Sequence, residues 1–141
     1  MSLHSLDWLV GLGCEMCSWT CRRAAEYDQL EVMKFYRSKG GQWNEDACKD
    51  AAEKGHLEIL KWMRQPPHPS PWDKRVCSFA ALGGQLEVLK WLRSEGCEWD
   101  EETCHFAAQG GHIEVLEVSL IALKESRPKY IYHCLLGLLE V

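Results

Sequence analysis

The sequence predicts an all-α fold built from repeated antiparallel helix pairs, and three observations predict it. A segment of the form C-x-x-A-A-x-x-x-x-L-E-[VI]-[ML]-K-[FW] begins at Cys21, Cys48 and Cys77, and a fourth copy from Cys104 keeps only its first half. The spacing of 27 to 29 residues is typical of stacked units, none of which can bury its hydrophobic face alone. Within each copy the apolar residues recur at helical rather than alternating spacing.

The first helix of each unit has a clear start in the fourth copy. Asp100 is a strong N-cap residue, and the glutamates that follow it stand in the first turn, where the helix dipole favours negative charge. Trp99 precedes this cap and Cys104 follows it at the spacing of a hydrophobic staple. The same arrangement recurs at Trp43 with Asn44 and Cys48, and at Trp72 with Asp73 and Cys77. We therefore expect Trp72 and Trp99 to be largely buried between neighbouring units.

The second helix follows after a glycine turn. Paired alanines allow close helix packing, and Gly110-Gly111 end the first helix of the fourth copy. His112 is then predicted to be the N-cap of the second helix, as His56 is in an earlier copy. In the third copy this helix is amphipathic and stops at residues 93–96, where a basic last turn meets a glycine.

Three segments carry a family resemblance: A-A-E-K-G-H-L-E-I-L-K at 51–61, A-A-L-G-G-Q-L-E-V-L-K at 80–90 and A-A-Q-G-G-H-I-E-V-L at 107–116. They resemble the A-A-x-x-G-H-L-E-V-V-K core of the ankyrin repeat. The resemblance implies an ankyrin-like solenoid of antiparallel helix pairs. The period is shorter than the usual 33 residues, and T-C-H-F at 103–106 replaces T-P-L-H. We therefore expect short or absent β-hairpin fingers, as in the Trp- and Cys-marked ankyrin arrays of protists and large DNA viruses.

The repeat register divides the chain. It predicts an ankyrin-like array over 1–127, with a half repeat at 1–16 and repeats from about 17, 44, 73 and 100, followed by a C-terminal capping helix at 128–141. Residues 7–15 align with residues 90–98, so the chain opens on the second helix of a unit. We expect it to be part of a longer repeat array.

Composition narrows the class of partner. A net charge of −5 supplies no basic footprint for nucleic acid. No apolar run is long enough to span a membrane, and no signal peptide is visible, which predicts a cytoplasmic protein with export as an open alternative. Six of the eight cysteines fall on two repeat positions, which predicts small buried thiols in a reducing compartment. We expect no disulfide among Cys21, Cys48, Cys77 and Cys104, and no cofactor.

Two chemical readings compete with this one. Cys14, Cys17 and Cys21, with His4 nearby, form a C-x-x-C-x-x-x-C pattern that suggests a small zinc or thiol-redox module, although only Cys17 is off the repeat pattern. His56 and His112 could act as bases, but no nucleophile recurs in a suitable relation to them. We therefore expect no metal site and no enzyme. The loop at 66–71 is proline-rich, which favours a rigid connector over a ligand for an aromatic groove.

The function that the resemblance implies is protein–protein interaction along the concave face and the ends of the first helices. Trp19 stands in the exposed first turn, and Arg22, Arg23 and Tyr27 can share its helix face. Alternatively, Trp19 covers the N-terminal edge of the array. The candidate partner-binding residues are Ser18, Trp19, Arg22, Glu26, Tyr27, Glu45, Asp46, Glu53, Lys54, Lys74, Arg75, Leu82, Glu101, Glu102 and Gln109. A structural spacer within a larger repeat protein is the other candidate function.

One pair of charges is predicted to meet at a joint between units. Arg23 and Asp50 occupy the repeat position that carries Phe79 and Phe106 in later copies. That position normally faces the neighbouring unit, where a charge is costly unless it is paired. We expect an Arg23–Asp50 ion pair, and a polar joint at the partner-binding end.

Overall fold

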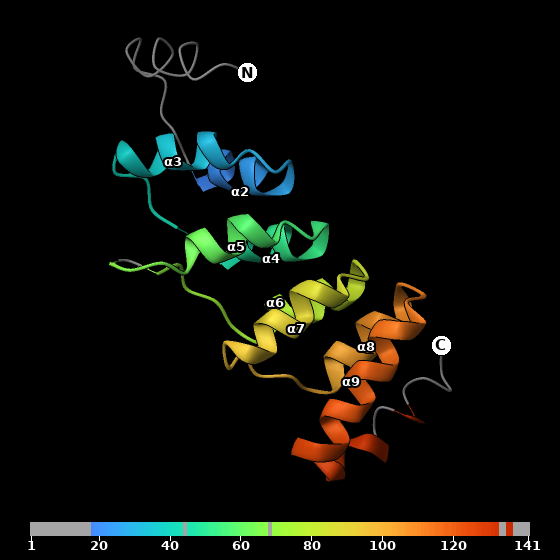
Figure 1. Ribbon diagram of the computed structural model, residues 1–141. Coiled ribbons are helices and arrows are strands. Elements are labelled where there is room, and N and C mark those ends of the chain that lie inside the picture. The colour runs from blue at the N-terminus through green and yellow to red at the C-terminus, as the bar shows by residue number, and fades with distance from the viewer. Residues whose placement is uncertain (1–17, 44, 68, 133–134, 137–141) are drawn as a thin grey trace.

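The structure is a computed structural model that describes residues 18–43, 45–67, 69–132 and 135–136. These residues are helical with no strand among them (Figure 1). The expected half repeat at 1–16 lies outside the described residues, as do 133–134 and 137–141 of the expected capping helix. The elements are α2 (Ser18–Glu26), α3 (Leu30–Ser38), α4 (Glu45–Lys54), α5 (Leu57–Met63), α6 (Arg75–Leu82), α7 (Leu86–Ser94), α8 (Glu101–Gln109), α9 (Ile113–Ser126) and the 3₁₀ turn η1 (Pro128–Tyr130).

Within the described residues, the helices are arranged as four pairs in a row. Within a pair the two helices pack together, as α2 does with α3 and α8 with α9. Between pairs the main contacts join α2 to α4, α4 to α6 and α6 to α8, so the first helices form a continuous layer (Figure 1). η1 packs on α9 at the end of the row. No helix in the described part of the chain is long and apolar enough to cross a bilayer.

The expected N-cap chemistry holds, with a shift of one residue in the third pair. The backbone N–H of Glu102 donates to Oδ1 of Asp100 at 3.0 Å, which confirms that cap. In the third pair α6 begins at Arg75, and its N–H donates to Oδ1 of Asp73 at 2.9 Å. Asn44 lies outside the described residues.

His56 and His112 are the N-cap residues of α5 and α9, as predicted, but the side-chain capping role expected of them is wrong, because neither side chain makes a capping hydrogen bond. Nε2 of His112 instead lies 3.0 Å from the carbonyl oxygen of Leu82, in the preceding pair. The imidazole is long enough to reach across the joint and satisfy a carbonyl at the end of the neighbouring first helix. Equivalent bonds join His56 Nε2 to Glu26 O at 2.8 Å and Gln85 Nε2 to Glu53 O at 3.2 Å. We call these three contacts the carbonyl bonds.

Glycine allows the pairs to approach closely beside each carbonyl bond. A Cβ atom at Gly83 would overlap the carbonyl oxygen of Glu53, and one at Gly110 would lie 2.5 Å from that of Leu82. Gly83 has φ −79°, which any residue can adopt. Space, and not backbone conformation, therefore requires glycine at this position.

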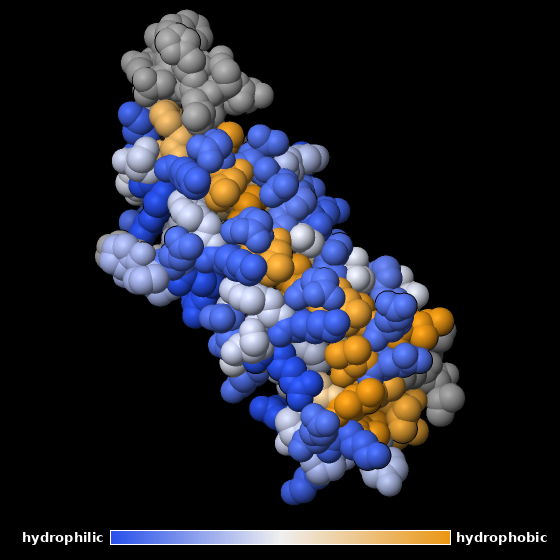
Figure 2. All heavy atoms as spheres, viewed as in Figure 1, coloured by the Kyte–Doolittle hydropathy of each residue, from blue (hydrophilic) through white to orange (hydrophobic). Residues whose placement is uncertain are grey.

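The core follows the row as a continuous strip. Except for Ala108, which is partly buried, the repeated cysteines and alanines of the first helices are fully or almost fully buried, together with most aliphatic residues of the second helices. Figure 2 shows apolar side chains in a stripe along the row, flanked by hydrophilic ones. Such a strip is what a stack of small units can bury, since each unit shares its apolar faces with its neighbours.

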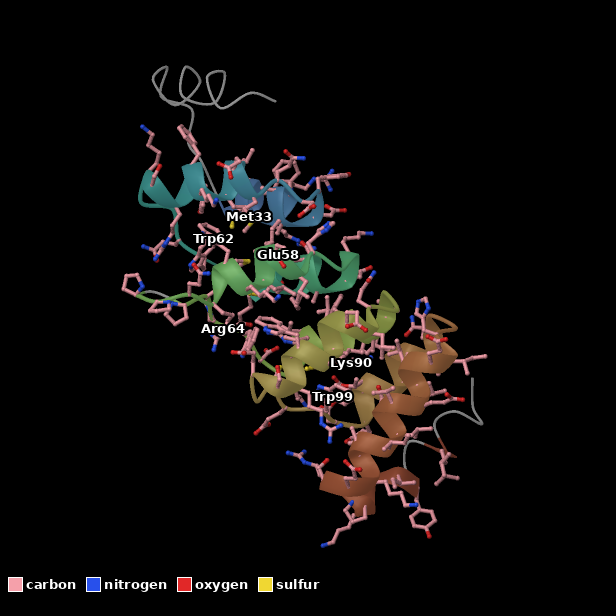
Figure 3. All side chains as sticks on the ribbon, viewed as in Figure 1. Met33, Glu58, Trp62, Arg64, Lys90 and Trp99 are labelled. Carbon is pink, nitrogen blue, oxygen red and sulfur yellow. The ribbon has the colours of Figure 1, made fainter. Side chains whose placement is uncertain are left out.

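Tryptophan side chains close each joint near the loops. Trp99 is 7% exposed and Trp72 is half-buried, so the expectation that both bury most of their surface is confirmed. Trp99 lies where the third and fourth pairs meet (Figure 3). Each of the three tryptophans that precede a first helix also has an arginine over its ring, a cation–π contact that was not predicted from the sequence. The contacts are Arg37 over Trp43 at 5.2 Å, Arg64 over Trp72 at 4.1 Å and Arg93 over Trp99 at 5.8 Å.

Replacement of Trp99 by alanine is expected to lower the free energy of unfolding by about 3 kcal/mol or more, because a buried aromatic side chain leaves a cavity. Urea denaturation followed by circular dichroism measures the loss. Trp19→Ala is the control, since Trp19 is 63% exposed and should change stability by less than about 0.5 kcal/mol. Equal effects of the two changes would contradict the packing.

Gly83→Ala is expected to destabilise the chain by about 1–3 kcal/mol, because the new methyl group must push against the Glu53 carbonyl. At an unstrained position the same change normally stabilises a protein by about 0.4–1 kcal/mol, so the sign alone is informative. Thermal and urea unfolding give that sign. An increase in stability would mean that α4 and α6 lie farther apart than described.

Candidate functional site

The candidate residues lie along the layer of first helices. Each pair contributes residues from its first helix or from the turns beside it, and these first helices pack against one another. Ser18, Trp19, Arg22, Glu26 and Tyr27 belong to the first pair; Glu45, Asp46, Glu53 and Lys54 to the second; Lys74, Arg75 and Leu82 to the third; and Glu101, Glu102 and Gln109 to the fourth.

An aromatic cluster stands at the first of these helices, formed by Trp19, Arg23 and Tyr27. Both rings are largely exposed, Trp19 at 63% and Tyr27 at 57%. The guanidinium carbon of Arg23 lies 5.5 Å from the Trp19 ring centre and 4.8 Å from that of Tyr27. Its Nη2 donates to the Tyr27 hydroxyl at 3.0 Å, and its Nη1 pairs with Glu26 at 2.7 Å. Arg23 thus contacts both rings on the surface.

The predicted ion pair between Arg23 and Asp50 is wrong, because a different arginine pairs with Asp50. It is Arg22 whose Nε lies 2.5 Å from Oδ2 of Asp50, across the joint between α2 and α4. The physical reason is that Tyr27 and Glu26 hold Arg23 on its own helix. The hydrogen bond to Asp50 raises the pKa of Arg22, whose guanidinium already carries its charge at neutral pH.

The predicted polar character of that joint is confirmed, whereas its place at a partner-binding end stays a prediction. Asp50 does face the neighbouring pair, and its side chain is only 13% exposed. In the later joint, Phe79 and Phe106 stack with ring centres 5.8 Å apart and planes 27° from parallel. In the joint between α4 and α6, Nζ of Lys49 lies 5.4 Å from the centre of the Phe79 ring. The joints therefore change from polar to aromatic along the row.

Several charged candidates pair with one another across the joints. Lys74 Nζ lies 2.6 Å from Oδ2 of Asp100, and Arg75 forms an ion pair with Glu45. The hydrogen bond to Asp100 raises the pKa of Lys74, and its charge is kept at neutral pH. The Arg75–Glu45 pair is exposed, and such pairs contribute only about 0–1 kcal/mol. Asp100 is buried, with 6% of its side chain exposed, so Lys74 compensates a carboxylate that lies largely out of water. Both pairs join neighbouring units.

Within α4, Asp46 pairs with Lys49, and this hydrogen bond lowers the pKa of Asp46. Leu82 is half-buried, and its carbonyl accepts the His112 bond. The other candidates, Glu53, Lys54, Glu101, Glu102 and Gln109, are exposed or partly exposed. Their place in the site stays a prediction.

The thiols at the shared repeat position are poor metal ligands. Burial raises the pKa of Cys21 to about 12 and that of Cys48 to about 11, so both are neutral at pH 7, whereas zinc binds the thiolate. His4, Cys14 and Cys17 lie outside the described residues. Among the described ones, no group of three or more His, Cys, Asp or Glu is arranged to hold a metal ion.

The proline-rich loop is anchored at its end. Ser70 is buried, its N–H donates to Met63 O at 2.7 Å, and its carbonyl accepts a hydrogen bond from Arg64 Nη1 at 2.8 Å. His68 lies outside the described residues. The two anchoring bonds favour the connector reading of this loop.

No family model matches the sequence, and the search of curated proteins finds no match. The case for any function therefore depends on the repeat pattern and on the surface described above.

A double-mutant cycle checks which arginine meets Asp50. Arg22→Met and Asp50→Leu should couple by about 0.2–1 kcal/mol in the free energy of unfolding, as expected for a pair with one exposed partner. Arg23→Met combined with Asp50→Leu is the matched control and should be additive. Coupling in the Arg23 cycle alone would restore the original assignment.

Proposed function

We propose that this chain is an ankyrin-type repeat scaffold that binds a partner protein along the layer of its first helices. The in-phase A-A-x-x-G motifs support the family, and the row of helix pairs supports a repeat architecture. The carbonyl bonds recur at one position of the second, third and fourth pairs, which is consistent with a repeat architecture. In a stack of this kind the buried residues are held constant and the exposed ones are free to vary from copy to copy.

The aromatic cluster carries the proposal that the surface binds protein. Tryptophan, tyrosine and arginine are the residues that dominate the binding energy of protein interfaces. A large ring exposed to water gives up hydrophobic free energy that a partner's surface can recover. Because Arg23 already orders both rings, binding loses less side-chain entropy than it would with free rotamers.

The histidines and thiols support binding over catalysis. Nε2 of His56 and of His112 is engaged by a backbone carbonyl, so that nitrogen serves the joint. Cys21 and Cys48 are buried neutral thiols, and the nucleophilic form of cysteine is the thiolate. Both residue types therefore have a structural use in the described joints.

A spacer function is the second candidate, and the ion pairs between units favour it. Lys74, Arg75 and Arg22 direct their charges to neighbouring pairs and stiffen the row. A spacer, however, has no use for two exposed rings, one on α2 and one in the turn directly after it. The variant experiment below separates the two functions.

Trp19→Ala combined with Tyr27→Ala is expected to abolish partner binding without changing the fold. Both rings are more than half exposed, so unfolding should be little affected while the interface loses its main apolar area. Proteins retained by the immobilised wild-type chain and lost with the double variant are identified by quantitative mass spectrometry. Each candidate is then purified, and its Kd for both chains is measured by calorimetry, with an expected weakening of 30-fold or more, or about 2 kcal/mol.

Ile113→Ala is the matched control, because Ile113 is 70% exposed on α9 at the other end of the row. It removes a comparable exposed apolar group and should leave the Kd unchanged. A partner whose affinity is insensitive to the double variant would refute this site. A chain with no partner that distinguishes the two variants would favour the spacer.

A further inference from the structure

Two buried thiols meet between α6 and the loop that follows α7. The Sγ atom of Cys77, on α6, lies 3.1 Å from Sγ of Cys97. A disulfide bond is about 2.05 Å long, so the two sulfur atoms need to move only about 1 Å closer to bond. In the sequence these two cysteines occupy two different repeat positions, and their contact was not predicted.

The preceding unit contains the same contact with a serine. Ser70 stands two residues before Trp72, as Cys97 stands two residues before Trp99. The Oγ atom of Ser70 lies 3.2 Å from Sγ of Cys48, the counterpart of Cys77. The fold thus brings this loop position against the first-helix cysteine in both units. Only in the third unit can the two side chains join covalently.

We propose that Cys77 and Cys97 form a reversible disulfide when the protein meets a peroxide oxidant. Cys97 is 9% exposed and lines a surface depression of about 460 Å³, with Trp72, Lys74 and Glu98 among its other walls. Cys77 is fully buried behind it. Oxidant therefore reaches the sulfur of Cys97 first.

The pKa shifts of the two thiols also indicate that Cys97 reacts before Cys77. The hydrogen bond that the Cys77 thiol donates lowers the pKa of Cys97, whereas that bond and burial raise the pKa of Cys77. Cys97 is therefore the thiol that ionises first and attacks the oxidant. Cys77 keeps its proton and resolves the product.

The reaction balances with one hydrogen peroxide. The Cys97 thiolate attacks one peroxide oxygen; an S–O bond forms, the O–O bond breaks and hydroxide leaves, which gives a sulfenic acid. The Cys77 sulfur then attacks the Cys97 sulfur, forming the S–S bond, while the S–O bond breaks and the departing hydroxide takes the Cys77 proton. The proton released by Cys97 on ionisation neutralises the first hydroxide. Two thiols and one peroxide become one disulfide and two waters.

The bond would tie α6 to the segment that starts the fourth pair. Trp99 and the N-cap Asp100 follow Cys97 directly, so a link to Cys77 anchors both the buried ring and the cap of α8. It also closes a loop of about 20 residues in the unfolded chain, which restricts the unfolded ensemble. Oxidation should therefore hold the third and fourth pairs together more firmly.

The test uses the full chain, reduced, desalted and exposed to a tenfold excess of hydrogen peroxide, then alkylated under denaturing conditions. Digestion with trypsin and a glutamate-specific protease separates Cys97 from Cys104, because Glu98, Glu101 and Glu102 lie between them. Mass spectrometry should find a peptide pair linked through Cys77 and Cys97 that dithiothreitol releases. The oxidised chain should melt roughly 5–10 °C higher than the reduced one.

Cys97→Ser is the matched variant, because it reproduces the Cys48–Ser70 contact that the chain already contains, and it should fold. It should show neither the linked peptide nor the rise in melting temperature. Ser70→Cys should conversely gain a second link, to Cys48. The proposal is overturned if Cys97 is recovered as sulfinic acid while Cys77 is alkylated, if both thiols are alkylated after peroxide, or if the links found involve other cysteines.

Discussion

The close approach of consecutive first helices is the constraint on which the rest of this structure depends. Two backbones can lie this near only if the residues between them are small and the carbonyl groups at the contact are satisfied. Alanine and glycine meet the first requirement, and the side chain of His56, Gln85 or His112 meets the second. The recurrence of A-A-x-x-G followed by histidine or glutamine is therefore one physical unit and not two separate motifs.

The outer side of each joint, where the second helices and the loops lie, is packed in a different way. The second helices contact one another less than the first helices do, and the space near the loops is filled by tryptophan. Edge-to-face contacts join Trp43 to Trp62 and Trp72 to Trp91, and an arginine lies over each loop tryptophan. The fourth unit has Val118 in place of that second-helix tryptophan, so the arrangement ends there.

Periodicity made the helices predictable, because the same apolar spacing and the same stop signals occur in every copy. The Asp100 cap, the burial of Trp99 and the Phe79–Phe106 contact all depend on repeat register, which the sequence displays directly. Contacts that depend on side-chain direction were harder to predict. Arg22 and Arg23 are adjacent in sequence and differ only in where they point, and the partner of His112 lies 30 residues away. The contact between Cys77 and Cys97 was not predicted, because the repeat register assigns each cysteine to a repeat position and does not show which repeat positions meet in space.

The joints are not equivalent, and this has a consequence for how the chain opens. The joint between α2 and α4 contains a partly exposed ion pair, whereas that between α6 and α8 has stacked rings. In a one-dimensional stack, stability is approximately a sum of unit and neighbour terms, so a weaker joint lets the units beyond it fray independently. Amide protons of the first pair would then exchange with solvent sooner than those of the third. Among the described pairs, the one that carries the exposed aromatic rings is accordingly the one expected to adjust its position most easily.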